Sequence, residues 1–226
     1  MKSKNTALNI IIIMIVSIFV MFIIEYFIVP GYIIKSIFKI SMFFIVPLLY
    51  ICYDKRINLA DYFRIYSKKQ FISSLLLGLS TYFLIVGVYF ILTTYIDLSQ
   101  IREIVYRSDD INRNNFFYVA IYISLLNSLL EEFFFRGFLF LSLNKTTSKV
   151  KAYFISALAF GIYHIGIMAD WFNAIIFLLA LIALFGVGFI FNYLNEGNKN
   201  IYSSWLVHMF ANFALNTIGL IIYGVF

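Results

Sequence analysis

Three ionisable side chains lie within six residues of one another, inside an apolar segment long enough to cross a membrane. They are Glu131, Glu132 and Arg136. A charged group at the depth of the bilayer costs roughly 2.5 to 3.5 kcal/mol even on insertion scales, so such groups mark an ion path, a proton path or a reactive centre. Glu132 and Arg136 are one helical turn apart and can pair, whereas Glu131 points about 100° away and can serve another task.

Both histidines of the chain also lie in apolar segments. His164 follows Phe160 by one helical turn, and His208 precedes Asn212 by one turn. Along their own helices, Glu131, His164 and Asn212 each lie about 20 Å from a flanking lysine. The lysines are Lys145, Lys151 and Lys199. One membrane histidine can be explained by a hydrogen bond between helices, but this agreement in depth favours a shared polar cavity.

Two kinds of chemistry suit these side chains. A buried glutamate beside a neutral imidazole can deprotonate water, and a second histidine with an asparagine can donate hydrogen bonds to a developing oxyanion. Water would then attack an amide without a covalent intermediate. Alternatively, Glu131, His164 and His208 could bind Zn²⁺ with one open position, although the sequence has no HExxH motif. A nucleophilic mechanism is disfavoured, because Cys52 has no histidine nearby in the sequence and no GxSxG motif occurs.

Composition places these side chains in an integral membrane protein. The 226 residues are 63% hydrophobic and 12% charged, with a mean hydropathy of +0.93, whereas soluble domains carry about 25% charged residues. The net charge of +6 is dispersed between apolar segments, which excludes a basic surface for nucleic acid. We therefore predict an all-α membrane protein of one transmembrane domain, residues 1–226. It would be a polytopic bundle of about seven transmembrane helices with an intramembrane polar cavity.

A membrane span needs about 20 mostly apolar residues. Seven segments qualify, at 8–27, 37–53, 71–95, 116–143, 152–169, 172–194 and 203–226. Lys39 lies near one end of the second segment, from where we expect its side chain to reach the lipid headgroups. Basic residues are concentrated in alternate loops, which predicts a cytoplasmic N-terminus and places the long loop 96–115 on the opposite side.

The motifs resemble those of the CPBP family of intramembrane proteases. This family is also called the Abi or CAAX-protease family, and it includes the Ras-converting CAAX endoprotease. Its motifs EExxxR, FxxxH and HxxxN/D are matched in order by Glu131, Glu132 and Arg136, by Phe160 and His164, and by His208 and Asn212. The resemblance implies that residues 116–226 form the catalytic core and that residues 1–115 supply N-terminal spans and loops.

The resemblance also implies a role for each motif residue. These roles are general base for Glu131, partner of that base for His164, an orienting ion pair for Glu132 and Arg136, and oxyanion stabilisation for His208 and Asn212. No cofactor is expected in such a glutamate-dependent mechanism. Zn²⁺ held by Glu131, His164 and His208 remains the alternative.

An endopeptidase acting on a membrane-associated peptide or protein is the function that the resemblance implies. A peptide pheromone or bacteriocin precursor in a bacterial cytoplasmic membrane would be such a substrate. The expected partners are this substrate and the lipid bilayer, without nucleic acid, and the oligomeric state is left open. Two alternatives are a non-catalytic scaffold or bacteriocin-immunity partner of a cell-envelope protein, and a proton-coupled transporter, for which the sequence shows no inverted repeat.

Overall fold

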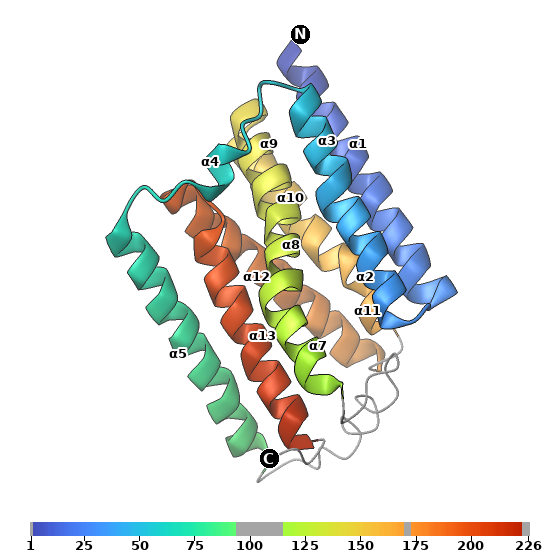
Figure 1. The fold of residues 1–226 in the computed structure, drawn as a ribbon, viewed down its shortest axis with the longest axis vertical. Coiled ribbons are helices and arrows are strands. Elements are labelled where there is room, and N and C mark those ends of the chain that lie inside the picture. Colours follow the sequence, from blue (N-terminus) through green and yellow to red (C-terminus); the bar gives the residue numbers. More distant parts are fainter. Residues whose placement is uncertain (1, 94–114, 170–172, 223–226) are drawn as a thin grey trace. The chain divides into compact units, whose positions relative to one another are not determined.

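The chain is built almost entirely from helices. The computed structural model describes residues 2–93, 115–169 and 173–222, with the side chains of residues 2–4 excepted. It is 88% helical, and these described residues contain no strand. Seven of their helices are long and apolar enough to cross a membrane (Figure 1). They are Asn5–Ile28, Tyr32–Tyr53, Lys68–Leu92, Phe116–Thr146, Lys149–Met168, Ala174–Asn198 and Tyr202–Ile222. The predicted all-α polytopic fold class is confirmed.

The second span differs most from its predicted position. It begins at Tyr32, five residues before the predicted start, because Gly31 adopts an extended conformation directly before the helix. Val29, with a left-handed φ of 44°, ends the preceding helical segment. The earlier start places Lys39 inside the span rather than near its end. The predicted loop 96–115 lies outside the described residues, apart from Asn115.

The chain divides into two compact units, which we describe separately. The first contains Met1–Ser67 and Leu130–Ser204, and the second contains Lys68–Leu129 and Trp205–Phe226. In the first unit lie α1 (Lys2–Phe22), η1 (Ile23–Ile28), α2 (Tyr32–Ile40), η2 (Ser41–Ile45), α3 (Val46–Tyr53), α4 (Ala60–Phe63), η4 (Phe133–Leu141), α9 (Ser142–Thr146), α10 (Lys149–Tyr163), α11 (Ile165–Met168) and α12 (Ala174–Asn198). In the second lie α5 (Lys68–Leu92), α7 (Phe116–Tyr122) and η3 (Ile123–Asn127). A unit boundary falls within α8 (Ser128–Glu132) and within α13 (Tyr202–Ile222).

Aromatic rings form the core of the first unit around η4, a π-helical segment whose residues are all buried. Phe134 of η4 stacks on Phe43 of η2, with ring centroids 4.3 Å apart. Phe135 meets the same Phe43 ring edge-on at 5.3 Å. Such pairs add stabilisation beyond the burial of their area. They fix η4, which contains the end of the EExxxR motif, against the second span.

Buried polar groups hold α12 in register with α10 and η4. The Ser156 hydroxyl lies 2.9 Å from the Phe135 carbonyl oxygen and 3.0 Å from Oδ1 of Asn192. Asn192 Nδ2 donates to the Tyr153 carbonyl at 3.2 Å. Ser156 and Asn192 are fully buried. Polar groups in a membrane interior must find such partners, because no bulk water can replace them.

Two glycines of α12 provide a test of this packing. A Cβ added at Gly188 would lie 2.8 Å from Cα of Ala157, whereas one at Gly186 would meet nothing within 4 Å. Both substitutions to alanine gain about 1 kcal/mol of helix propensity, but overpacking at Gly188 costs about 1 to 3 kcal/mol. We expect Gly188→Ala to lower Tm in detergent and Gly186→Ala to keep or raise it. Equal Tm values for the two variants would contradict the close approach of α10 and α12.

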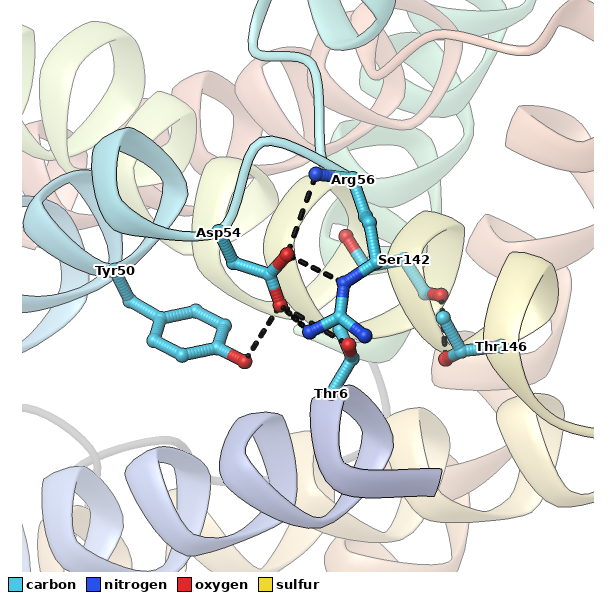
Figure 2. A network of polar contacts seen from close by, with 6 residues as sticks. All are labelled: Thr6, Tyr50, Asp54, Arg56, Ser142 and Thr146. Atoms are coloured by element: carbon cyan, nitrogen blue, oxygen red, sulfur yellow. Dashed lines mark hydrogen bonds and ion pairs between the residues drawn. The ribbon is translucent and has the colours of Figure 1, made fainter. Parts of the chain in front are cut away.

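A polar network lies just beyond the end of α3 (Figure 2). The Asp54 carboxylate accepts hydrogen bonds from Nε and Nη2 of Arg56, each at 2.6 Å. Thr6 Oγ1 and the Tyr50 hydroxyl each donate to the same carboxylate at 3.0 Å. The hydrogen bond from the Arg56 guanidinium is the strongest of these. Together they hold the pKa of Asp54 well below its ordinary value. The network ties the beginning of α1 to the loop that follows α3.

Acidification should therefore weaken the protein through Asp54. A carboxyl whose pKa is lowered by folding stabilises the folded state above its unfolded pKa, about 3.9, and this stabilisation is lost as the pH falls further. We expect Asp54→Asn to lower Tm at pH 7 and to flatten the decline in Tm between pH 5 and pH 3. If the curves of Tm against pH are parallel for wild type and Asp54→Asn, the Asp54 carboxylate makes no pH-dependent contribution to stability.

Candidate active site

The Glu132–Arg136 ion pair is present and fully buried. Arg136 Nη1 lies 3.3 Å from Oε1 of Glu132, and neither side chain has any exposed area. Both residues lie where the helix passes from α8 into η4. A charge buried alone would be strongly destabilising, so each of these two side chains requires the other.

Aromatic rings surround the Arg136 guanidinium. Its Cζ lies 4.1 Å from the ring centroid of Phe160, 5.0 Å from that of Phe191 and 5.9 Å from that of Phe135. Apart from the ion pair, its nitrogens find no hydrogen-bond acceptor among the described residues. The charge is instead stabilised by the faces of the rings, an interaction worth about 2 kcal/mol or more when desolvated. The phenylalanine of the FxxxH motif thus contacts the arginine of the EExxxR motif.

Glu131 faces a lysine from the second span. Lys39 Nζ lies 3.2 Å from Oε1 of Glu131, and both residues are buried, at 9% and 3% exposure. The prediction that Lys39 reaches the headgroups is therefore wrong. Because α2 begins at Tyr32, Lys39 lies about 10 Å inside the helix. An ionisable group at that depth turns inward to a partner.

His164 lies where α10 ends, and its ring is oriented by the FxxxH motif. Its Nδ1 lies 2.7 Å from the carbonyl oxygen of Phe160, one turn earlier. A carbonyl can only accept, so Nδ1 carries the hydrogen and a neutral ring presents a lone pair at Nε2. The Phe160 ring meets the imidazole edge-on at 4.6 Å. Phe160 therefore orients His164 with its backbone and faces Arg136 with its ring.

Tyr163 connects the two reactive groups of the first unit. The Lys39 ammonium lies 5.1 Å from the Tyr163 ring centroid, and this ring lies 5.0 Å from the imidazole of His164. Glu131 and His164 are thus joined through the intervening contacts of Lys39 and Tyr163. Neither Lys39 nor Tyr163 was among the catalytic residues predicted from the sequence. Lys39 could have been identified from the sequence as an ionisable residue within an apolar span. For Tyr163 the sequence offers only its position beside His164.

The other two predicted residues lie on α13 in the second unit. His208 is buried, with 9% exposure. Asn212 Nδ2 donates to the Ile123 carbonyl at 3.4 Å, and Asn216 Nδ2 donates to the Ala120 carbonyl at 3.3 Å. Since an amide nitrogen carries two hydrogens, the bond to Ile123 is compatible with a second bond to substrate. Asn212 therefore pairs α13 with η3 in addition to its predicted catalytic role.

The predicted residues are divided between the units. Four belong to the first unit and two to the second, so their convergence in one layer stays a prediction. The first group is Glu131, Glu132, Arg136 and His164, and the second is His208 and Asn212.

The same division applies to the proposed zinc ligands Glu131, His164 and His208. Within the first unit, the Glu131 carboxylate already faces the Lys39 ammonium, and a second cation at that carboxylate would be repelled.

Comparison with known proteins agrees with the motifs. Residues 113–214 match the family model described as type II CAAX prenyl endopeptidase Rce1-like. The match includes every predicted site residue but leaves out Lys39. It confirms the resemblance to the CPBP, Abi or CAAX-protease family. No curated protein and no solved structure matches the chain.

Proposed function

Because residues 113–214 form a domain of the Rce1-like type II CAAX endopeptidase family, we propose that this integral membrane protein is an intramembrane endopeptidase. It would hydrolyse a peptide bond of a membrane-associated peptide or protein. The observation that carries the proposal is the buried EExxxR motif, in which Glu131 faces Lys39 and Glu132 faces Arg136. Charges at this depth are expensive and accordingly mark a functional site.

Glu131 is the general base in this proposal. A carboxylate shielded from bulk water can take a proton from a single bound water while the water oxygen attacks the substrate carbonyl carbon. Lys39 engages Oε1 of Glu131, so we assign the water to Oε2. His164, with Nδ1 held by the Phe160 carbonyl, offers Nε2 to the other hydrogen of the water.

The remaining steps need an oxyanion site and a proton for the leaving group. We assign the oxyanion of the tetrahedral intermediate to His208 and Asn212, whose N–H groups can donate to it. Glu131 then returns its proton to the amide nitrogen as the C–N bond breaks. The products are a carboxylic acid and an amine, and no covalent enzyme intermediate forms.

Glu132 and Arg136 have a supporting role in the proposal. Glu132 follows Glu131 directly and holds Arg136 on the same helix. The Arg136 guanidinium packs against the Phe160 ring of α10 and the Phe191 ring of α12, and these contacts limit the rotation of the helix that carries the base. The Phe160 ring lies over the Arg136 guanidinium, and the Phe160 carbonyl orients His164. The base and its histidine partner are therefore aligned through one shared phenylalanine.

The proposed substrate is a peptide presented at membrane depth in a bacterial cytoplasmic membrane. The seven apolar helices support a site that acts within the membrane. Basic residues in alternate loops support a cytoplasmic N-terminus.

The experiment that tests the proposal is peptide cleavage by the purified protein in lipid nanodiscs. A quenched library of membrane peptides, with and without prenylated C-termini, would be analysed by mass spectrometry. We expect cleavage at a defined internal bond by wild type, unchanged by a chelator, and none by Glu131→Gln. Cleavage that is lost on chelation and restored by Zn²⁺ would replace this mechanism with a metal-dependent one. If wild type cleaves nothing and Glu131→Gln keeps full activity in cells, the scaffold alternative is correct.

A further inference from the structure

We infer that Lys39 is a positioning residue of the proposed site, which binds Oε1 of Glu131 and thereby holds the carboxylate in the orientation that presents it to the water. The catalytic role of Lys39 rests on the proposed function, whereas its ion pair with Glu131 does not. Lys39 lies outside the residues matched by the family model. The site thus includes a residue from the N-terminal spans.

The physical need for such a partner follows from burial. Glu131 is 3% exposed, in an apolar helix packed by phenylalanine rings. A carboxylate buried in such surroundings without a polar partner would carry a large desolvation cost. The Lys39 ammonium, 3.2 Å from Oε1 of Glu131, offsets that cost and holds the carboxylate in one orientation through a charge-assisted hydrogen bond.

The position of the ammonium is fixed by packing on both sides. Phe43 lies one turn after Lys39 and stacks on Phe134, which lies one turn after Glu131. The Tyr163 ring lies 5.1 Å from Nζ on another side. These ring contacts pack the second span against the EExxxR helix next to the ion pair. They therefore hold the Lys39 ammonium at one oxygen of the Glu131 carboxylate.

A second lysine of α2 provides a matched control. Lys35, one turn before Lys39, is 8% exposed and lies 3.3 Å from Oε2 of Glu25. This pair has similar burial and distance, but Glu25 lies outside the matched domain and carries none of the proposed chemistry. Loss of the Lys35 pair should therefore affect folding to a similar extent without affecting the hydrolytic step.

The test compares Lys39→Met, Lys39→Arg and Lys35→Met in the cleavage assay, with Tm measured for each variant. We expect Lys39→Met to lower kcat by about 10-fold or more, a part of the typical contribution of a general base, with KM within about 2-fold of wild type. Arginine retains the charge, so Lys39→Arg should recover most of kcat. Lys35→Met should lower Tm as Lys39→Met does while keeping kcat.

Three results would overturn the inference. They are a wild-type kcat for Lys39→Met, an equal loss of kcat in Lys35→Met, and no recovery by Lys39→Arg when that variant is as stable as wild type. A stability comparison separates this inference from the proposed function. Lys39→Met combined with Glu131→Gln should have a higher Tm than Lys39→Met alone, and equal Tm values would disprove the ion pair. Absence of cleavage by wild type, together with full activity of Glu131→Gln in cells, would instead disprove the proposed function.

Discussion

Glu131→Gln is expected to lower kcat for peptide cleavage by about 10²- to 10⁴-fold, the usual contribution of a positioned general base. Glutamine keeps the size and much of the hydrogen bonding of glutamate, but its amide cannot accept the proton of the attacking water. Initial rates with the mapped peptide, measured with wild type and variant in nanodiscs, give the ratio directly. The substitution also removes the carboxylate that Lys39 faces, so Tm is measured on the same samples.

Glu196→Gln is the matched control for this loss. Glu196 also lies within residues 113–214, but it pairs with Lys149 at 2.8 Å where both side chains are partly exposed. Because Glu196 belongs to none of the motifs and pairs with Lys149, we expect Glu196→Gln to keep kcat. Glu131→Gln combined with Lys39→Met should recover stability without recovering activity. If Glu131→Gln cleaves at the wild-type rate, Glu131 is not the base.

Arg136→Ala should lower the free energy of unfolding by about 3 to 5 kcal/mol, the cost of leaving one member of a buried ion pair behind. It should also abolish cleavage. Glu132 would lose its counter-ion, and the rings of Phe160 and Phe191 would face a cavity in place of the guanidinium. Unfolding in mixed micelles of increasing SDS content, followed by intrinsic fluorescence, measures the change.

An exposed ion pair of the same unit provides the contrast. Lys145 lies 2.6 Å from Asp61, closer than Arg136 lies to Glu132, but its side chain is 54% exposed and that of Asp61 is 34% exposed. Exposed pairs contribute at most about 1 kcal/mol, so Lys145→Ala should change stability little. Glu132→Gln combined with Arg136→Met should recover part of the loss, since an apolar pair can replace a buried ionic one. Equal stability of Arg136→Ala and Lys145→Ala would disprove the role of burial.

The seven spans were predictable from the sequence because their cause is local. Within a bilayer the backbone must satisfy its own hydrogen bonds, which requires a helix of about 20 apolar residues wherever the chain crosses. The Glu132–Arg136 pair was predictable for a similar reason, since residues four apart share a helix face. The contact between Phe160 and His164 follows the same spacing.

Contacts between distant segments were not predictable in this way. Lys39 and Glu131 are 92 residues apart in the chain, and nothing in either segment alone specifies that they meet. The Lys39 prediction failed because the start of the second span, at Tyr32, determines how deep the lysine lies. Phe191 over the Arg136 guanidinium and Asn212 on the Ile123 carbonyl are likewise contacts between separate helices.

The sequence by itself therefore determined the helices, their approximate ends, the motif residues and the Glu132–Arg136 ion pair. Each of these depends on hydrophobicity and on the 3.6-residue period of the helix, which act over a few turns. Only the tertiary structure decided which charge balances Glu131, which rings surround Arg136 and how His164 is oriented by its surroundings. Those contacts depend on how side chains of different helices pack, a property that no single segment carries.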